Sequence, residues 1–186
     1  MKNSNTTFDI MFLPIEMISS WKRASISSSF CSCLLNTKEQ NTYLNNILSS
    51  TINECLEFAI KHGVKKSENY SLSCNQNNEI ITINLTIYLL SQQIILLKNY
   101  IKKIQSINKN KDFEKTLFTK EFSELGHAIY SITNDFKGKI KIENKKNKEK
   151  KHSSILKTNI IIKLNNKDIQ HDYQNWRLHH RLKFTK

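Results

Sequence analysis

The sequence predicts an α+β fold, a two-layer sandwich in which helices cover one face of a mainly antiparallel sheet. Three observations support this prediction. Short alternating apolar runs predict strands, a long apolar stripe at helical spacing predicts a helix, and the elements follow in the order strand, helices, hairpin, two helices, hairpin. The 186 residues fit one domain over residues 1–164, followed by a basic C-terminal tail over residues 165–186.

The N-terminal region predicts a strand and then a segment that fits neither strand nor helix spacing. An apolar run over residues 8–13 ends at Pro14, which is typical of an opening strand. Residues 17–35 are rich in serine and leave their element type open. We expect three large side chains of this segment to lie in the core: Trp21, Phe30 and Leu34.

A long helix is predicted over residues 38–62. Apolar residues recur on one face of this segment, and Cys55 is among them. Thr37, followed three residues later by Gln40, has the capping-box pattern of a helix start. Gly63 comes directly after the last apolar position, where glycine suits a helix C-terminal cap.

A hairpin and a further helix are predicted next. Residues 70–74 and 79–89 predict two strands, joined by a polar turn over residues 75–78. Ser91 is placed to cap the following helix. The uncharged segment 80–97 is therefore interpreted as a strand, a turn and a helix, and we expect no membrane partner.

The last third of the domain predicts one helix and two strands. An amphipathic helix begins at Thr119. Its apolar face is formed by Phe122, Leu125, Ile129 and Ile132. Strands are predicted over residues 139–144 and 155–164, with the lysine-rich residues 145–151 between them.

The composition excludes some nucleotide sites and concentrates positive charge near the C-terminus. Three glycines and one proline are too few for a glycine-rich phosphate loop of the Walker, Rossmann or kinase type. The chain carries 29 Lys and Arg against 16 Asp and Glu, a net charge of +13. Residues 137–163 hold ten lysines against Glu143 and Glu149. The abundance of Lys, Asn and Ile is typical of an AT-rich genome, so codon bias explains part of this charge.

The cysteines and histidines predict no metal site. Cys31, Cys33, Cys55 and Cys74 have neither the spacing of paired zinc knuckles nor the density of a disulfide framework. Free thiols are typical of a reducing compartment, and the residues after Met1 lack the apolar run of a signal peptide. The tail histidines are interpreted as solvent-exposed: His171, His179 and His180.

Four stretches of the sequence match a known pattern in their order. They are residues 12–14, 53–61, 84–87 and 125–129. They resemble the opening strand, the N-box helix, the strand after the hairpin and the last helix of the GHKL (Bergerat-fold) ATP-binding regulators. That group contains anti-sigma-factor serine kinases and histidine-kinase catalytic domains. The likeness covers most of residues 8–164 and is closest to a small cyanobacterial family of stand-alone regulators; with the AT-rich composition it implies the cytoplasm or the plastid stroma.

The resemblance also implies a nucleotide site that has lost its chemistry. Glu54 matches the position of the glutamate that activates water, but Phe58 stands where an Mg²⁺-binding asparagine is expected. Phenylalanine offers no oxygen ligand to a hard cation. Of the glycine-rich lid only Gly126 remains, and the aspartate-glycine motif that reads adenine is absent. Glu54 and Gly126 are therefore interpreted as a relic cofactor site, with no catalytic residue and no bound ATP or Mg²⁺.

The leading functional hypothesis is a non-catalytic regulator that acts through protein–protein contacts, with a response-regulator, phosphatase or sigma-like partner. We expect its partner surface near residues 108–127 and along the tail. One alternative is a basic nucleic-acid-associated protein that uses residues 137–186. Its phosphate contacts would be Lys145, Lys146, Lys148, Lys150, Lys151, Arg177 and Arg181. A further alternative is a regulator of the serine-kinase type that still binds ATP.

Overall fold

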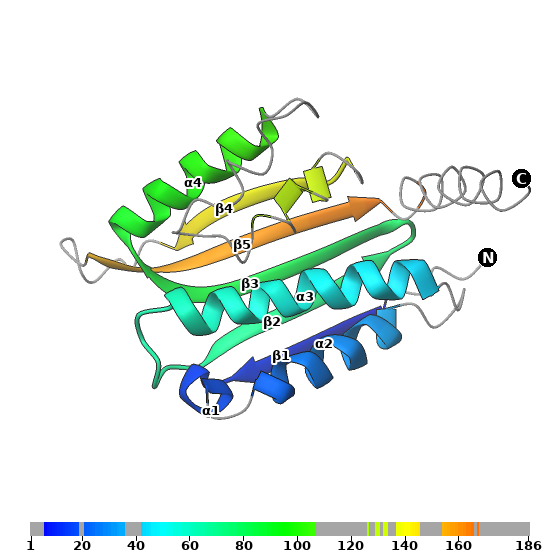
Figure 1. Ribbon diagram of the computed structural model, residues 1–186, viewed down its shortest axis with the longest axis horizontal. Helices are drawn as coiled ribbons and strands as arrows, with labels where there is room; N and C mark the ends of the chain where they lie inside the picture. The colour runs from blue at the N-terminus through cyan, green and yellow to red at the C-terminus, as the bar shows by residue number, and fades with distance from the viewer. Residues whose placement is uncertain are drawn as a thin grey trace, which may run out of the picture.

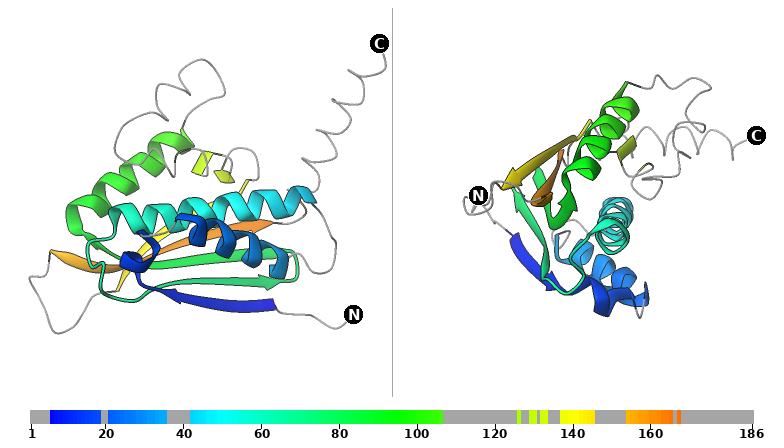
Figure 2. Two further views of the ribbon diagram at one scale, coloured as in Figure 1. Left: turned by 60° about the horizontal axis from the view of Figure 1, so that its bottom comes forward. Right: turned by 90° about the vertical axis from the view of Figure 1, so that its left-hand side faces the viewer.

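The predicted fold class is confirmed. The computed structural model describes residues 6–18, 21–35, 42–106, 126, 129–130, 132–133, 137–145, 154–165 and 167. Over these residues the protein is an α+β sandwich, with a five-stranded sheet and a layer of helices on one face of it (Figure 1). The second view in Figure 2 looks along the layers and places the labelled helices of Figure 1 on the same side of the sheet.

The sheet is antiparallel throughout. Its strands are β1 (Thr6–Phe12), β2 (Tyr70–Asn77), β3 (Ile80–Leu90), β4 (Lys139–Lys145) and β5 (Ile155–Asn165). Their order across the sheet is β1-β2-β3-β5-β4, and each neighbouring pair runs antiparallel. The predicted strands and hairpins are therefore present, and β3, at the centre, is paired along its whole length with β5.

Four helices complete the described layer. They are α1 (Pro14–Ile18), α2 (Trp21–Leu35), α3 (Thr42–His62) and α4 (Ser91–Gln105). The α3 helix lies across the middle of the sheet, with α2 and α4 on either side of it (Figure 1). The predicted long helix is thus confirmed from Thr42 onward, whereas Thr37 and Gln40 lie outside the described residues.

The core lies between α3 and the inner face of the sheet. Every second side chain of β3 from Ile81 to Leu89 is buried, as the period of a strand requires. From α3, the buried residues facing this layer include Leu48, Ile52, Cys55, Leu56 and Ala59. Each fully buried leucine or isoleucine contributes about 1.5–3 kcal/mol of transfer free energy. This layer is therefore the main source of stability.

The serine-rich segment is helical because its small side chains face α3. Ala24, Ser28 and Cys31 are buried along one side of α2. The Ser28 hydroxyl donates to the Ser25 carbonyl at 2.9 Å and lies 3.4 Å from the hydroxyl oxygen of Ser49 in α3. Short side chains that bond their own helix let two helices approach closely without a bulky apolar seam.

The core positions expected in this segment were largely wrong. Phe30 is exposed and Leu34 only half-buried, whereas the Trp21 side chain lies outside the described part of the structure. A search for large apolar residues selects the wrong face of α2, because here the small residues are the buried ones.

The start of α4 differs from the prediction in its cap. The Ser91 hydroxyl donates to the Ser154 carbonyl at 3.1 Å and so does not cap the helix. Instead the Gln93 side chain accepts from the Leu90 amide at 2.9 Å and donates to the His62 carbonyl at 3.3 Å. Gln93 therefore connects the start of α4 to the end of α3. The segment between β3 and α4 needs no turn, since α4 begins directly at Ser91.

The fourth predicted helix is described only in part. Gly126 has helical backbone and is buried, as are the predicted apolar positions Ile129 and Ile132. Phe122 and Leu125 lie outside the described residues. Of the predicted tail, only Asn165 and Lys167 are described, and β5 ends at Asn165.

Gly63 follows α3, but it does not form the expected left-handed cap. No described glycine has a positive φ. A Cβ at Gly63 would overlap the ring of Tyr70 and would lie 2.6 Å from the Ala59 carbonyl oxygen. Tyr70 is fully buried, and its hydroxyl accepts from the Lys65 amide at 3.2 Å. Glycine is therefore required here by the close approach of Tyr70.

We predict that Gly63→Ala destabilises the protein by about 1–3 kcal/mol, because the added methyl group has to displace a buried ring. Urea unfolding followed by circular dichroism measures the change. Glu68→Ala, an exposed change in the same loop, should alter the free energy of unfolding by less than about 0.5 kcal/mol. Equal stability of the two variants would mean that Tyr70 does not pack against Gly63.

We also predict that one of the four thiols reacts in the folded protein. Cys33 is exposed, whereas Cys31, Cys55 and Cys74 are buried. Burial raises the pKa of Cys31 to about 11, so this thiol stays protonated at about pH 8. A thiol reagent such as DTNB should modify Cys33 quickly and the other three only in urea. Cys33→Ser should remove the fast phase; a fast phase that persists would contradict the packing of α2.

Candidate functional site

The inner face of α3 carries the residues of the predicted relic nucleotide site. Glu54 is half-buried, and Phe58, one turn further along, is fully buried. The Phe58 ring lies against the His62 ring, with centroids 4.9 Å apart. The position where the resemblance implies a metal-binding amide therefore holds an aromatic pair.

The surroundings of this helix face are apolar. Burial, with a smaller contribution from the neighbouring Glu54 carboxylate, raises the pKa of the Cys55 thiol to about 12. A thiol with so high a pKa is neither a nucleophile nor a metal ligand at neutral pH, because both roles need the thiolate. Cys55 acts here as a small hydrophobic side chain.

Between α3, α4 and the sheet lies one small cavity of about 10 Å³. It is lined by apolar side chains that include Cys55, Leu97, Ile129, Ile132, Ile160 and Ile162. A single water needs roughly 10–15 Å³ and polar partners, and ligand pockets usually measure about 300–1,000 Å³. This part of the interior is therefore filled by the protein's own side chains and has no room for a nucleotide.

The outer face of the sheet has a different character, because no described helix lies on it (Figure 2). Its side chains are mostly polar, as the alternation of the strands requires. The register places them in rows across the five strands. One row is Thr7, Asn75, Thr82, Lys163 and Lys139, and the next is Asp9, Ser73, Asn84, Ile161 and Lys141.

An open hollow of about 660 Å³ lies on this outer face, at the end of the β2–β3 hairpin. The polar side chains that line it are Asn75, Asn77, Thr82, Asn84, Glu79 and Lys163. The hairpin turns tightly at Asn78, whose φ is 55°, a value that asparagine tolerates better than most residues. The volume lies in the range of ligand sites, in contrast to the inner cavity.

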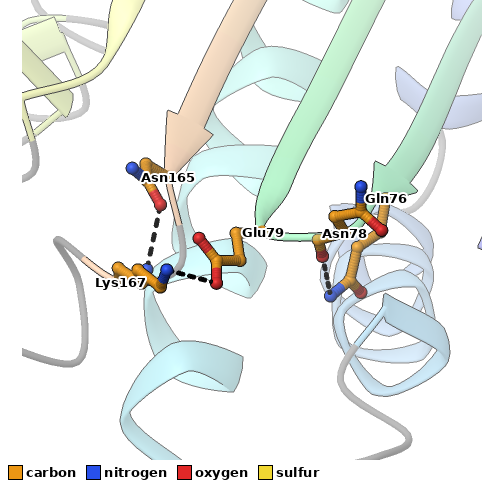
Figure 3. Close-up of polar contacts among 5 residues, drawn as sticks. All are labelled: Gln76, Asn78, Glu79, Asn165 and Lys167. Atoms are coloured by element: carbon orange, nitrogen blue, oxygen red, sulfur yellow. Dashed lines mark hydrogen bonds and ion pairs between the residues drawn. The ribbon is translucent and has the colours of Figure 1, made fainter. Parts of the chain in front are cut away.

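The one acidic side chain of this hollow is already paired. The Glu79 carboxylate lies 2.7 Å from the Lys167 ammonium group (Figure 3). The Lys167 amide in turn donates to the Asn165 side-chain oxygen at 3.0 Å, so the chain after β5 is held beside the hairpin. On the other side, the Gln76 amide donates to the Asn78 carbonyl at 3.4 Å. Lys163 therefore dominates the charge of the hollow.

The predicted phosphate contacts fall mostly outside the described residues. Lys145 ends β4, but its side chain is not among those described. The remaining six members of that set lie outside the described ranges: Lys146, Lys148, Lys150, Lys151, Arg177 and Arg181. The basic residues that the structure does place on the outer face are Lys139, Lys141, Lys157 and Lys163. Reading the strands with period two would have assigned these four lysines to one face.

The residues considered for a metal do not assemble among those described. Cys31 is buried and Cys33 exposed, so the two thiols of this motif lie on different sides of α2. Within the described ranges, no three acidic, cysteine or histidine side chains form a group that would hold a metal ion. Within the same ranges, no helix has the length and apolar character needed to cross a membrane.

Comparison with known proteins gives no further guide. No protein-family model matches the chain, and no curated protein matches it. A function is therefore inferred from the chain's own residues, above all from the filled inner layer and the open outer face.

We predict that Phe58→Asn, which places an amide at the implied metal position, lowers the free energy of unfolding by about 3–5 kcal/mol. The variant loses a buried ring and leaves an amide without partners. Urea unfolding measures this change, with the exposed Gln92→Asn as the control. A Phe58→Asn protein as stable as the wild type, and stabilised further by Mg-ATP, would show that position 58 faces a metal-binding space.

Proposed function

We propose that the chain is a non-catalytic regulator with a degenerate GHKL-like fold, which acts through protein–protein contacts. The partner we propose is a response-regulator, phosphatase or sigma-like protein, in the cytoplasm or the plastid stroma. The element order of the sheet and helices is compatible with this proposal, and so is the apolar filling around Cys55 and Phe58. A regulator of this kind needs a binding surface but no nucleotide.

The observation that carries the proposal is a pair of large apolar side chains exposed on α2. Phe30 is 61% exposed and Ile26, one turn earlier, is 59% exposed, so both project from the side of the helix opposite to α3. Two further isoleucines, Ile15 and Ile18, are exposed on α1. An aromatic anchor beside aliphatic residues is typical of the centre of a protein interface.

The chemistry of α2 explains why this surface does not close onto the domain. Its small residues, such as Ala24 and Ser28, already fill the contact with α3. The large residues are left on the outside, where each loses transfer free energy of about 1.5–3 kcal/mol that a partner would recover. The surface expected near residues 108–127 and along the tail lies outside the described residues and stays a prediction.

We predict that the double variant Ile26→Ser, Phe30→Ser loses a partner that the wild-type protein captures. Capture is measured by affinity purification from the native host, with washing at about 0.5 M salt to weaken charge-driven contacts. The control is Ile95→Ser on α4, because Ile95 is also 60% exposed. A partner retained equally by both variants, or released from the wild type by salt, would contradict contact through α2.

We further predict that millimolar Mg-ATP does not change the melting temperature of the protein. A nucleotide present at a hundredfold excess over its Kd would stabilise the folded state by about 2.7 kcal/mol, which thermal denaturation detects readily. A clear shift that Glu54→Gln removes would contradict the proposal. It would favour instead the alternative of a kinase-like regulator that still binds ATP.

A further inference from the structure

We propose that the outer face of the sheet binds single-stranded nucleic acid, with phosphates on the lysines of β4 and β5 and a base in the asparagine-lined hollow. This is a second function, on the opposite side of the sheet from α2, and it does not depend on the protein partner. It also differs from the predicted use of residues 145–151 and the tail, because the surface combines residues of β2, β3, β4 and β5.

The first argument is the placement of like charges on neighbouring strands. Lys139 is directly opposite Lys163 in the β4–β5 register, and Lys145 is directly opposite Lys157. Like charges facing each other across strands destabilise a sheet. Within the described residues, no carboxylate forms an ion pair with Lys139 or Lys163. A bound anion would relieve this repulsion, so the free protein is built with a charge arrangement that a polyanion completes.

The carboxylate nearest to these lysines does not remove the positive field. Glu143 pairs with Lys141 at 2.6 Å. Its pKa is lowered, first by the hydrogen bond and charge of Lys141 and to a smaller degree by the charge of Lys163. The ionised Glu143 therefore neutralises one lysine of the group and leaves Lys139 and Lys163 available to phosphates.

The second argument is the chemistry of the hollow beside these lysines. Lys163 and Ile161 line it, and their register partners on β4 are Lys139 and Lys141, so the phosphate-binding and hollow-lining residues are contiguous. The Asn75 and Asn77 side chains make no hydrogen bond among the described residues. An amide offers both a donor and an acceptor, which is the pattern that reads the edge of an unpaired base.

The same features favour nucleic acid over an acidic protein segment. An acidic peptide would satisfy the lysines, but its carboxylates would leave the amide donors and acceptors of the hollow only half used. A volume of about 660 Å³ has room for a planar base. The Tyr88 ring is not assigned a stacking role, because the ammonium groups of Lys65 and Lys157 already lie 4.8 and 5.8 Å from its centroid.

Fluorescence anisotropy with labelled single-stranded RNA and DNA of about 12 nucleotides tests the proposal on the full chain. The first variant is Lys139→Gln, Lys141→Gln, Lys163→Gln. We expect it to weaken binding at least about tenfold, and to reduce the slope of log K against log salt by about 2, at roughly 0.7 per lost phosphate contact. Its melting temperature should equal or exceed that of the wild type, because like-charge repulsion is removed.

The matched control removes the same charge from the other side of the molecule. Lys98, Lys102 and Lys103 are exposed on α4, and their triple change to glutamine should leave affinity and slope unaltered. Equal losses from both triple variants would mean that net charge alone drives binding. That result, or no binding at about 50 mM salt, would overturn the proposal.

A second pair of variants tests the hollow separately from the lysines. Asn75→Asp keeps the size of the side chain but places a carboxylate among the amides, and we expect it to weaken binding about tenfold. Asn99→Asp, at an exposed position on α4, should have no effect. If polyglutamate of similar length binds as tightly as the oligonucleotides and Asn75→Asp matches Asn99→Asp, the partner is an acidic protein and the nucleic-acid proposal fails.

Discussion

The burial of the inner face of β3 beneath α3 is the interaction on which the rest of the structure depends. β3 is central, and both of its neighbours and the two edge strands take their register from it. Because side chains alternate along a strand, a fully apolar inner face from Ile81 to Leu89 requires the polar residues between them to face outward. The described helices cover one face only, so this single constraint creates both a closed interior and an open polar surface.

The two faces divide the chemistry of the molecule. Inside, Phe58, Cys55 and the isoleucines around them occupy the layer where the family resemblance implies a nucleotide. Outside, hydrophobic exposure on α2 and paired lysines on β4 and β5 are both unfavourable in the isolated chain, and each becomes favourable when a partner of matching chemistry binds. We infer that this protein works by presenting surfaces and not by enclosing a substrate.

The sequence predicted most of the strands and α3 because their patterns are long and regular. It failed where close contact decides the structure. Phe30 was assigned to the core since it is large, but the buried side of α2 is made of small residues that approach α3. Gly63 was given a left-handed cap, yet it is required by the ring of Tyr70. The hollow could not be foreseen, because Asn75 and Lys163 meet only through the register of three strands.

The central claim is that the interior is filled and that binding belongs to the outer surface. Amide proton–nitrogen correlation spectra of the isotope-labelled protein, recorded with Mg-ATP and separately with a single-stranded oligonucleotide, test it most directly. The account predicts that Mg-ATP leaves the amide signals of Cys55 and Phe58 unmoved, while the oligonucleotide shifts those of Asn75, Thr82 and Lys163. The reverse pattern, with nucleotide-dependent shifts along α3 and none on the outer face, would contradict it.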